Sequence, residues 1–145
     1  MKKEYIIGIV IGVAFIVAMI LCIVIAKIGP KKAEFIPTIS KVKSLDEKGN
    51  VTDSEEIAKL EGEDKSKLDE YVKQIGESAQ KEKYSLIIFV DYNIRVSEHI
   101  SIKIKSDIKE YVYYVDDTKE GSEREIATRA PEGFVEWVMS KVNNK

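Results

Sequence analysis

An uninterrupted apolar run from Tyr5 to Ala26 constrains this chain more than any other feature of its sequence. Every residue in the run is apolar or small, and lysines flank it on both sides. As a helix it would reach roughly 33 Å at about 1.5 Å per residue, enough to cross a hydrocarbon core of about 30 Å. The run therefore predicts a single transmembrane helix behind a short N-terminal tail.

A cleaved signal peptide is the rival interpretation of the same run. The apolar region of a signal peptide usually has about 7 to 15 residues and ends in small residues that the peptidase recognises. Here the run is longer and leads into Ala26, Lys27 and Ile28 without an Ala-x-Ala pattern. Lipid attachment at Cys22 is disfavoured because the bulky Leu21 precedes it. The sequence favours an uncleaved anchor.

The anchor and the rest of the chain form separate regions. Residues 1–28 are predicted to be the membrane anchor with its tail, because Gly29 and Pro30 cannot continue a helix easily. Residues 29–34 form a short linker, and residues 35–145 form a polar domain. A domain of this size can bury enough surface to fold without a metal or a disulfide. We therefore expect no cofactor.

Small residues in the anchor are candidates for contact with another helix. Such residues let helix backbones approach closely inside a membrane, where packing rather than hydrophobicity drives association. The anchor is therefore a candidate for homo-oligomer formation. The small residues lie at intervals of four: Gly8 and Gly12 on one line, and Ala14, Ala18, Cys22 and Ala26 on the other.

Charge near the anchor gives two conflicting indications of orientation. Lys27, Lys31 and Lys32 outnumber Lys2 and Lys3, and an excess of lysine marks the cytoplasmic side. These three lysines are also candidates for contact with lipid head groups. A short tail before a long apolar segment is instead typical of a bacterial signal anchor. We favour the second indication and expect a single-pass protein of the cell membrane with an extracytoplasmic domain.

The charge and cysteine content of the chain exclude several classes of partner and site. The formal net charge of the whole chain is −2. Several of its lysines lie around the anchor, so the domain alone is more acidic than the whole chain. An acidic domain is a poor match for nucleic acid, which requires clustered cations. The single cysteine excludes an intramolecular disulfide and a thiolate metal cluster.

Periodicity in the domain predicts an α+β fold, with helices covering a mostly antiparallel sheet of three to five strands in two layers. Residues 84–92 are apolar on both alternating faces, which is typical of a central strand. Thr52 or Asp53 has the pattern of a helix cap. The predicted order is an edge strand at 35–45, a helix starting near 53, a helix at 64–80, strands at 84–92, 100–104, 111–115 and 125–129, and a helix opening at Pro131.

No residue pattern predicts catalytic chemistry. His99 is the only histidine and is expected on the solvent-exposed face of a strand, together with Ser101 and Lys103. One imidazole does not make a zinc site. The acidic loop from Asp116 to Glu125 lacks the spacing of a calcium loop, and phosphate loops, GxSxG and HExxH are missing. The sequence predicts no catalytic, cofactor-binding or metal site.

These observations favour an interaction or scaffolding module that acts at the membrane surface of a bacterial envelope and binds another membrane or envelope protein. One alternative is an unfamiliar membrane-tethered enzyme, hydrolase-like, that uses Asp91, His99 or the acidic loop. Another is a structural subunit of an envelope or secretion assembly. An exposed aromatic edge would favour binding, with Tyr111, Tyr113 and Tyr114 as its candidates, whereas a cleft with convergent polar groups would favour an enzyme.

Overall fold

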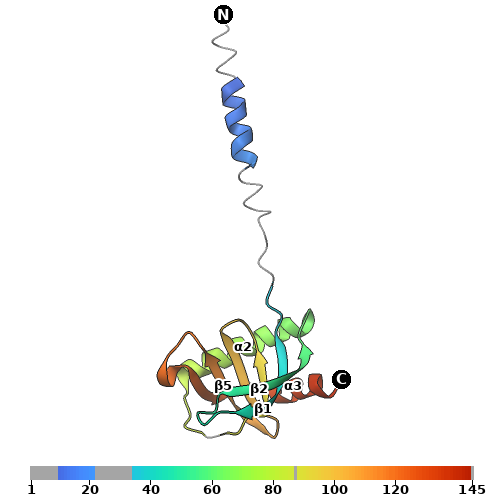
Figure 1. The fold of residues 1–145 in the computed structure, drawn as a ribbon, viewed down its shortest axis with the longest axis vertical. Helices are drawn as coiled ribbons and strands as arrows, with labels where there is room; N and C mark the ends of the chain where they lie inside the picture. The colour runs from blue at the N-terminus through green and yellow to red at the C-terminus, as the bar shows by residue number, and fades with distance from the viewer. Residues whose placement is uncertain (1–9, 22–33, 87, 145) are drawn as a thin grey trace, which may run out of the picture. The chain divides into compact units, whose positions relative to one another are not determined.

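The computed structural model describes residues 10–21, 34–86 and 88–144. The chain separates into two compact units, Met1–Glu34 and Phe35–Lys145. The described part of the first unit contains one helix over residues 10–21, and all of its side chains are exposed. The second unit holds the sheet and the other two helices (Figure 1).

The predicted transmembrane anchor is contradicted by this structure. Among the described residues, no helix is long and apolar enough to cross a membrane. The remainder of the apolar run lies outside the described residues. The predicted localisation as a single-pass protein of the cell membrane is contradicted by the same finding.

The second unit is an α+β fold built on a six-stranded antiparallel sheet in the order β2-β1-β3-β4-β5-β6 (Figure 1). The prediction of three to five strands was therefore too low. The strands are β1 (Thr38–Leu45), β2 (Val51–Lys59), β3 (Tyr92–Arg95), β4 (Ile100–Lys105), β5 (Ile108–Asp116) and β6 (Glu125–Arg129). The helices are α2 (Glu63–Lys81) and α3 (Phe134–Asn143), and a short 3₁₀ turn, η1 (Gly121–Glu123), precedes β6.

Both helices pack on one face of the sheet. Side chains alternate between the two faces of a strand, so Ile102 and Ile104 of β4 point to the helices while Ser101 and Lys103 point away. The aromatic centre of the core is Tyr71 of α2, whose ring lies 5.1 Å from that of Phe134 and 5.5 Å from that of Trp137. The buried apolar residues that form this core cluster are Ile39, Ala58, Leu60, Leu68, Ile75, Ile94, Ile102, Ile104, Val112, Phe134, Val135, Trp137 and Val138.

The first predicted elements of the domain differ from the observed ones. The stretch after Thr52 forms β2 instead of a helix, because it pairs along its length with β1. The observed helix begins after Gly62, whose φ of 61° most other residues would not adopt readily. β1 lies between β2 and β3 and is not an edge strand. Pro37 precedes its first residue, so the missing proline N–H removes no hydrogen bond from the ladder.

Residues 84–91 do not form the predicted central strand. They begin at the outer edge of β6, where the Tyr84 N–H donates to the Ala127 carbonyl at 3.0 Å. They end beside β1 and β4, where the Asp91 N–H donates to the Ile104 carbonyl. The helix α2 contacts β5 and β6, whereas β3, the next strand along the chain, lies between β1 and β4. The chain must therefore cross the sheet between the end of α2 and the start of β3. We call the described residues 84–86 and 88–91 the crossing segment.

The remaining sequence predictions match the structure more closely. The predicted strands at 100–104, 111–115 and 125–129 are confirmed as β4, β5 and β6, and the helix after Pro131 is confirmed as α3. In each case a short stretch carries one apolar face against the same core.

Candidate binding site

The sheet face opposite the helices, called here the open face, carries a row of polar side chains across its middle. Cross-strand pairing places the polar side chains in the order Ser40, Asn93, Lys103 and Tyr113, and the small Ala127 of β6 follows them. Lys103 is only 6 % exposed, although an ammonium group prefers water. Something other than the helices must therefore cover this face.

The turn between β1 and β2 is one of the two covers. Asp46 organises it by accepting hydrogen bonds from the backbone N–H groups of Lys48 and Asn50 and from the Asn50 side chain. The side-chain bond from Asn50 is the main reason that the pKa of Asp46 lies below its ordinary value of 3.8. The Gly49 carbonyl accepts a hydrogen bond from Lys103 Nζ at 3.3 Å. This bond ties the turn to the sheet.

Lys103 also forms a partly buried ion pair. Its Nζ donates to Glu125 Oε1 of β6 at 3.0 Å, and the Glu125 side chain is about one-third exposed. A buried ammonium is tolerated when a carboxylate and further acceptors satisfy it, and both conditions hold here.

The crossing segment is the second cover. The Tyr113 hydroxyl accepts a hydrogen bond from the Ile88 N–H at 2.9 Å and donates one to the Leu86 carbonyl at 2.7 Å. This single side chain therefore holds the backbone of the crossing segment at both Leu86 and Ile88. Val90 is turned inward and buried, whereas its neighbour Phe89 is 76 % exposed.

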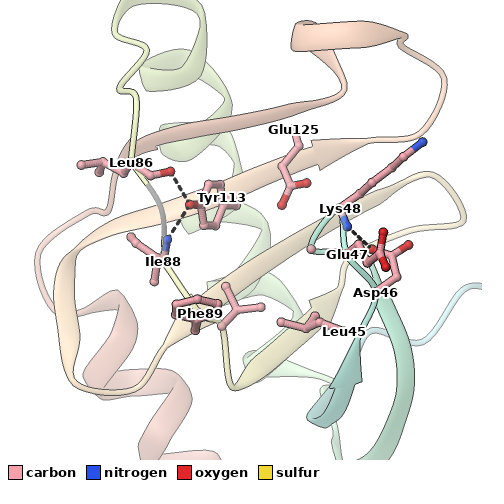
Figure 2. A pocket seen from close by; sticks show the side chains of 11 residues that line it. Leu45, Asp46, Glu47, Lys48, Leu86, Ile88, Phe89, Tyr113 and Glu125 are labelled. Atoms are coloured by element: carbon pink, nitrogen blue, oxygen red, sulfur yellow. Dashed lines mark hydrogen bonds between the residues drawn. The ribbon is translucent and has the colours of Figure 1, made fainter.

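A hollow of about 530 Å³ lies on the open face between these two covers, and we call it the apolar groove. Figure 2 shows Tyr113 and Glu125 between the crossing segment on one side and the turn on the other. The apolar lining consists of Leu45, Leu86, Ile88, Phe89, Val90 and Tyr113, and the turn adds Asp46, Glu47, Lys48 and Gly49.

A second hollow of about 240 Å³, the polar hollow, lies on the other side of the turn. It shares Glu125 with the apolar groove, and the end of the turn contributes Asn50 to its wall. Its principal polar groups come from Asn93, Arg95, Ser101, Lys103 and Arg124.

Comparison with known protein families, characterised proteins and solved structures finds no match. The two hollows of the open face are therefore features from which a function can be inferred.

The anchor residues singled out in the sequence divide between described and undescribed regions. Gly12, Ala14 and Ala18 lie on the helix over residues 10–21, where all three are exposed. Outside the described residues lie Gly8, Cys22 and Ala26, together with the lysines proposed to contact lipid, Lys27, Lys31 and Lys32.

His99 lies just before β4 rather than on the strand itself, and its side chain is exposed. Its Nδ1 is 2.7 Å from Asp117 Oδ1, forming a pair at the rim of the polar hollow. In the part of the chain that the structure describes, no hydroxyl or thiol side chain bonds to the imidazole ring. Nor do three or more His, Cys, Asp and Glu residues gather there as they would around a metal ion.

Asp91 and the acidic loop both have structural partners. Asp91 accepts hydrogen bonds from the Ser106 N–H and hydroxyl, and it pairs with Lys105 at 3.5 Å. It thereby holds the turn between β4 and β5. Asp116 accepts from the hydroxyl and N–H of Thr118, and the hydroxyl bond is the main cause of its lowered pKa. Neither Asp91 nor Asp116 lines the apolar groove or the polar hollow.

The three tyrosines proposed as an exposed aromatic edge do not form one. The Tyr111 ring packs on Tyr84 at 5.1 Å, and Tyr113 lies under the crossing segment. Tyr114 points to the helix side, where burial raises the pKa of its hydroxyl. The exposed aromatic residue of the domain is Phe89, although the sequence pattern predicts it inside a central strand.

Proposed function

We propose that the second unit is a protein-binding module that receives an apolar side chain of its partner in the apolar groove. The exposure of Phe89 at the rim of this groove is the observation that carries the proposal. A large aromatic side chain in water beside a hollow is typical of an interaction site, since covering it releases a large apolar area.

Hydrogen bonds connect both walls of the groove to the sheet. The two walls come from segments without ladder pairing of their own, yet each is tied to the sheet: the crossing segment by Tyr113, and the turn by Lys103. A site fixed before binding loses less conformational entropy when its ligand arrives.

Charge around the groove favours a partner residue that is cationic. Asp46 and Glu47 lie on the turn wall with Lys48, and Glu125 already pairs with Lys103. The Asp46 carboxylate is ionised at neutral pH, as an aspartate with the ordinary pKa of 3.8 would also be. The groove therefore suits a segment in which a large apolar residue neighbours a lysine or an arginine.

The groove geometry supports a bound segment better than the two alternatives. An enzyme that used His99 as a base would need a nucleophile within hydrogen-bonding distance, and the described residues place none there. A permanent structural subunit would usually bury about 2,000 Å² or more of total surface, whereas a hollow of about 530 Å³ matches one or two side chains.

A peptide selection with the intact chain tests this proposal. We expect a random peptide library to yield sequences with an aromatic or large aliphatic residue beside Lys or Arg. Phe89→Ala should weaken the affinity for the selected peptide about 30-fold in isothermal titration calorimetry, which corresponds to a hot-spot contribution of about 2 kcal/mol.

Ile36→Ala provides the matched control. Ile36 is another exposed apolar residue, but it lies outside the groove, so its loss should leave the affinity unchanged. Selected peptides that bind Phe89→Ala as tightly as the parent chain, or that lack a common apolar residue, would rule out the groove as the binding site.

A further inference from the structure

A hollow of about 370 Å³ lies on the helix side of the sheet, between the last turns of α2 and the adjacent ends of β5 and β6, and we call it the helix pocket. Its apolar surface comes from Ala79 of α2 and from Tyr114 and Ile126, which are cross-strand partners in β5 and β6. The helix pocket shares no lining residue with the apolar groove or the polar hollow. A ligand there would occupy a site of its own.

Gly76 lines the helix pocket from the interior of α2. Glycine in a helix interior is less stabilising than alanine, because it gives up more backbone freedom on folding. The packing of α2 does not require glycine here, since a Cβ atom would lie 3.9 Å from the nearest atoms of the Tyr114 ring and hydroxyl, an ordinary contact distance. What the glycine preserves is therefore the space of a methyl group beside the Tyr114 hydroxyl.

The Tyr114 hydroxyl is a donor without a partner. It forms no hydrogen bond with any described residue, although its ring packs against the core. It is also open to the pocket, because Asn93 Oδ1 is the only side-chain nitrogen or oxygen of the described residues that is both enclosed and without a hydrogen bond. The hydroxyl is protonated at neutral pH, and burial raises its pKa further above the ordinary value of 10.0. It can therefore donate to a ligand.

The charges around the helix pocket cancel. Lys83 and Lys119 line it together with Asp116 and Glu123. The Asp116 carboxylate already accepts hydrogen bonds from the hydroxyl and the N–H of Thr118. Neither an anion nor a cation gains a net attraction from two positive and two negative groups, so the pocket favours an uncharged ligand.

We propose that the helix pocket binds a small uncharged molecule with a flat apolar ring and a carbonyl oxygen, the chemistry of an aromatic ketone or amide. The Tyr114 hydroxyl donates to the carbonyl oxygen, and the ring occupies the space beside Gly76, against Ala79 and Ile126. A volume of about 370 Å³ lies at the lower end of the range for ligand pockets, which suits a molecule of one ring. This site does not depend on the function proposed for the apolar groove.

Three probes of similar shape test the role of each group. Acetophenone carries the ring and the carbonyl oxygen, α-methylstyrene has a CH₂ group in place of that oxygen, and benzoate adds a negative charge. Titrated into the ¹⁵N-labelled intact chain, acetophenone should shift the amide resonances of Gly76, Tyr114 and Ile126. Benzoate should bind more weakly than acetophenone, since the pocket offers its charge no net attraction.

Tyr114→Phe keeps the ring and removes the donor. It should weaken the affinity for acetophenone about fivefold, the usual effect of one hydrogen bond. It should not weaken the affinity for α-methylstyrene, which accepts no hydrogen bond. Each probe is measured against both proteins, so the greater hydrophobicity of α-methylstyrene cancels in the comparison.

Gly76→Ala separates binding from stability. Its methyl group fills the space beside the hydroxyl, so the affinity for acetophenone should fall several-fold, while the melting temperature should rise by about 4 °C because alanine stabilises a helix interior. A loss of affinity in a more stable variant cannot come from partial unfolding. Gln74→Ala changes an exposed position of the same helix outside the pocket and should leave the affinity unchanged.

Several results would overturn the proposal. One is an affinity of Gly76→Ala equal to that of the parent chain, and another is a Tyr114→Phe variant that weakens both uncharged probes equally or neither of them. Tighter binding of benzoate would identify an anion site instead. Shifts confined to Phe89 and Tyr113 would place the ring in the apolar groove, and the absence of shifts at Gly76 and Tyr114 up to the solubility limit of acetophenone would exclude the helix pocket as its site.

Discussion

At the scale of single residues, Lys103 connects three parts of the domain. Its stem lies on the middle of the open face, and its ammonium binds both Glu125 of β6 and the carbonyl of Gly49 in the turn. Sequence alternation placed Lys103 correctly on the face away from the apolar core. It did not reveal that the side chain is buried, because the covering turn comes from residues far away in the sequence.

Lys103→Met should lower the free energy of unfolding by about 2 kcal/mol, because it leaves Glu125 partly buried without its partner. The double variant Lys103→Met, Glu125→Leu should recover most of that loss, since no unpaired charge remains. Urea denaturation of the two variants measures both effects. A single variant as stable as the parent would show that the pair contributes little, and Lys119→Met controls for the loss of a lysine at an exposed site.

At the scale of elements, the crossing segment is where local pattern and structure diverge most. A run of consecutive apolar residues predicts burial on both sides, and a central strand is the usual structure for such a run. Here Val90 is buried against the open face while Phe89 faces outward, so the run crosses the sheet without joining it. The apolar groove could not be predicted for this reason, whereas β4 and β5 could, because β4 alternates apolar and polar residues and β5 is rich in aromatic residues.

Tyr113→Phe should release the crossing segment without disturbing the sheet. The change deletes one hydroxyl and leaves the Ile88 N–H without its acceptor, at a cost of about 1 kcal/mol. Hydrogen exchange at the Ile88 amide should accelerate, while exchange at Val112 in the same strand should stay at the parent rate. Unchanged protection of Ile88 would mean that other contacts hold the segment.

The turn between β1 and β2 should be sensitive to acid. The folded pKa of Asp46 is lower than its ordinary value of 3.8, so the carboxylate stabilises the turn above that value and loses this effect as the pH falls through the folded pKa. The amide shifts of Lys48 and Asn50 should therefore change with a midpoint below 3.8. Asp46→Asn should remove the transition, and a midpoint at or above 3.8 in the parent chain would contradict the hydrogen-bonded turn.

At the scale of the whole molecule, the two units have unequal roles. All of the core residues belong to the second unit, between Ile39 and Val138. The sequence predicted an α+β domain from residue 35 onward, but not its strand order, because the position of β3 between β1 and β4 depends on pairings between distant segments. The apolar run that dominates the sequence led to a prediction of a membrane span that the structure contradicts.

A fragment of residues 35–145 should unfold in a single cooperative transition, at a midpoint temperature within about 2 °C of the corresponding transition in the intact chain, since it keeps the entire core. Calorimetry of both proteins tests this. A fragment that melts broadly or far lower would show that residues before Phe35 stabilise the domain.

The insertion of β3 also determines the order in which the sheet can assemble. The β1–β2 hairpin and the β4–β5–β6 meander each form from neighbours in sequence, but in the strand ladder they are joined only through β3, whose partner β1 is separated from it by β2 and α2. Contacts of such long sequence separation slow the search for the native state. We therefore expect the rate-limiting step to be the docking of one preformed piece on the other. Substitutions at the interface of Ile39 with Ile94 should then change the unfolding rate more than the folding rate, which stopped-flow kinetics can measure.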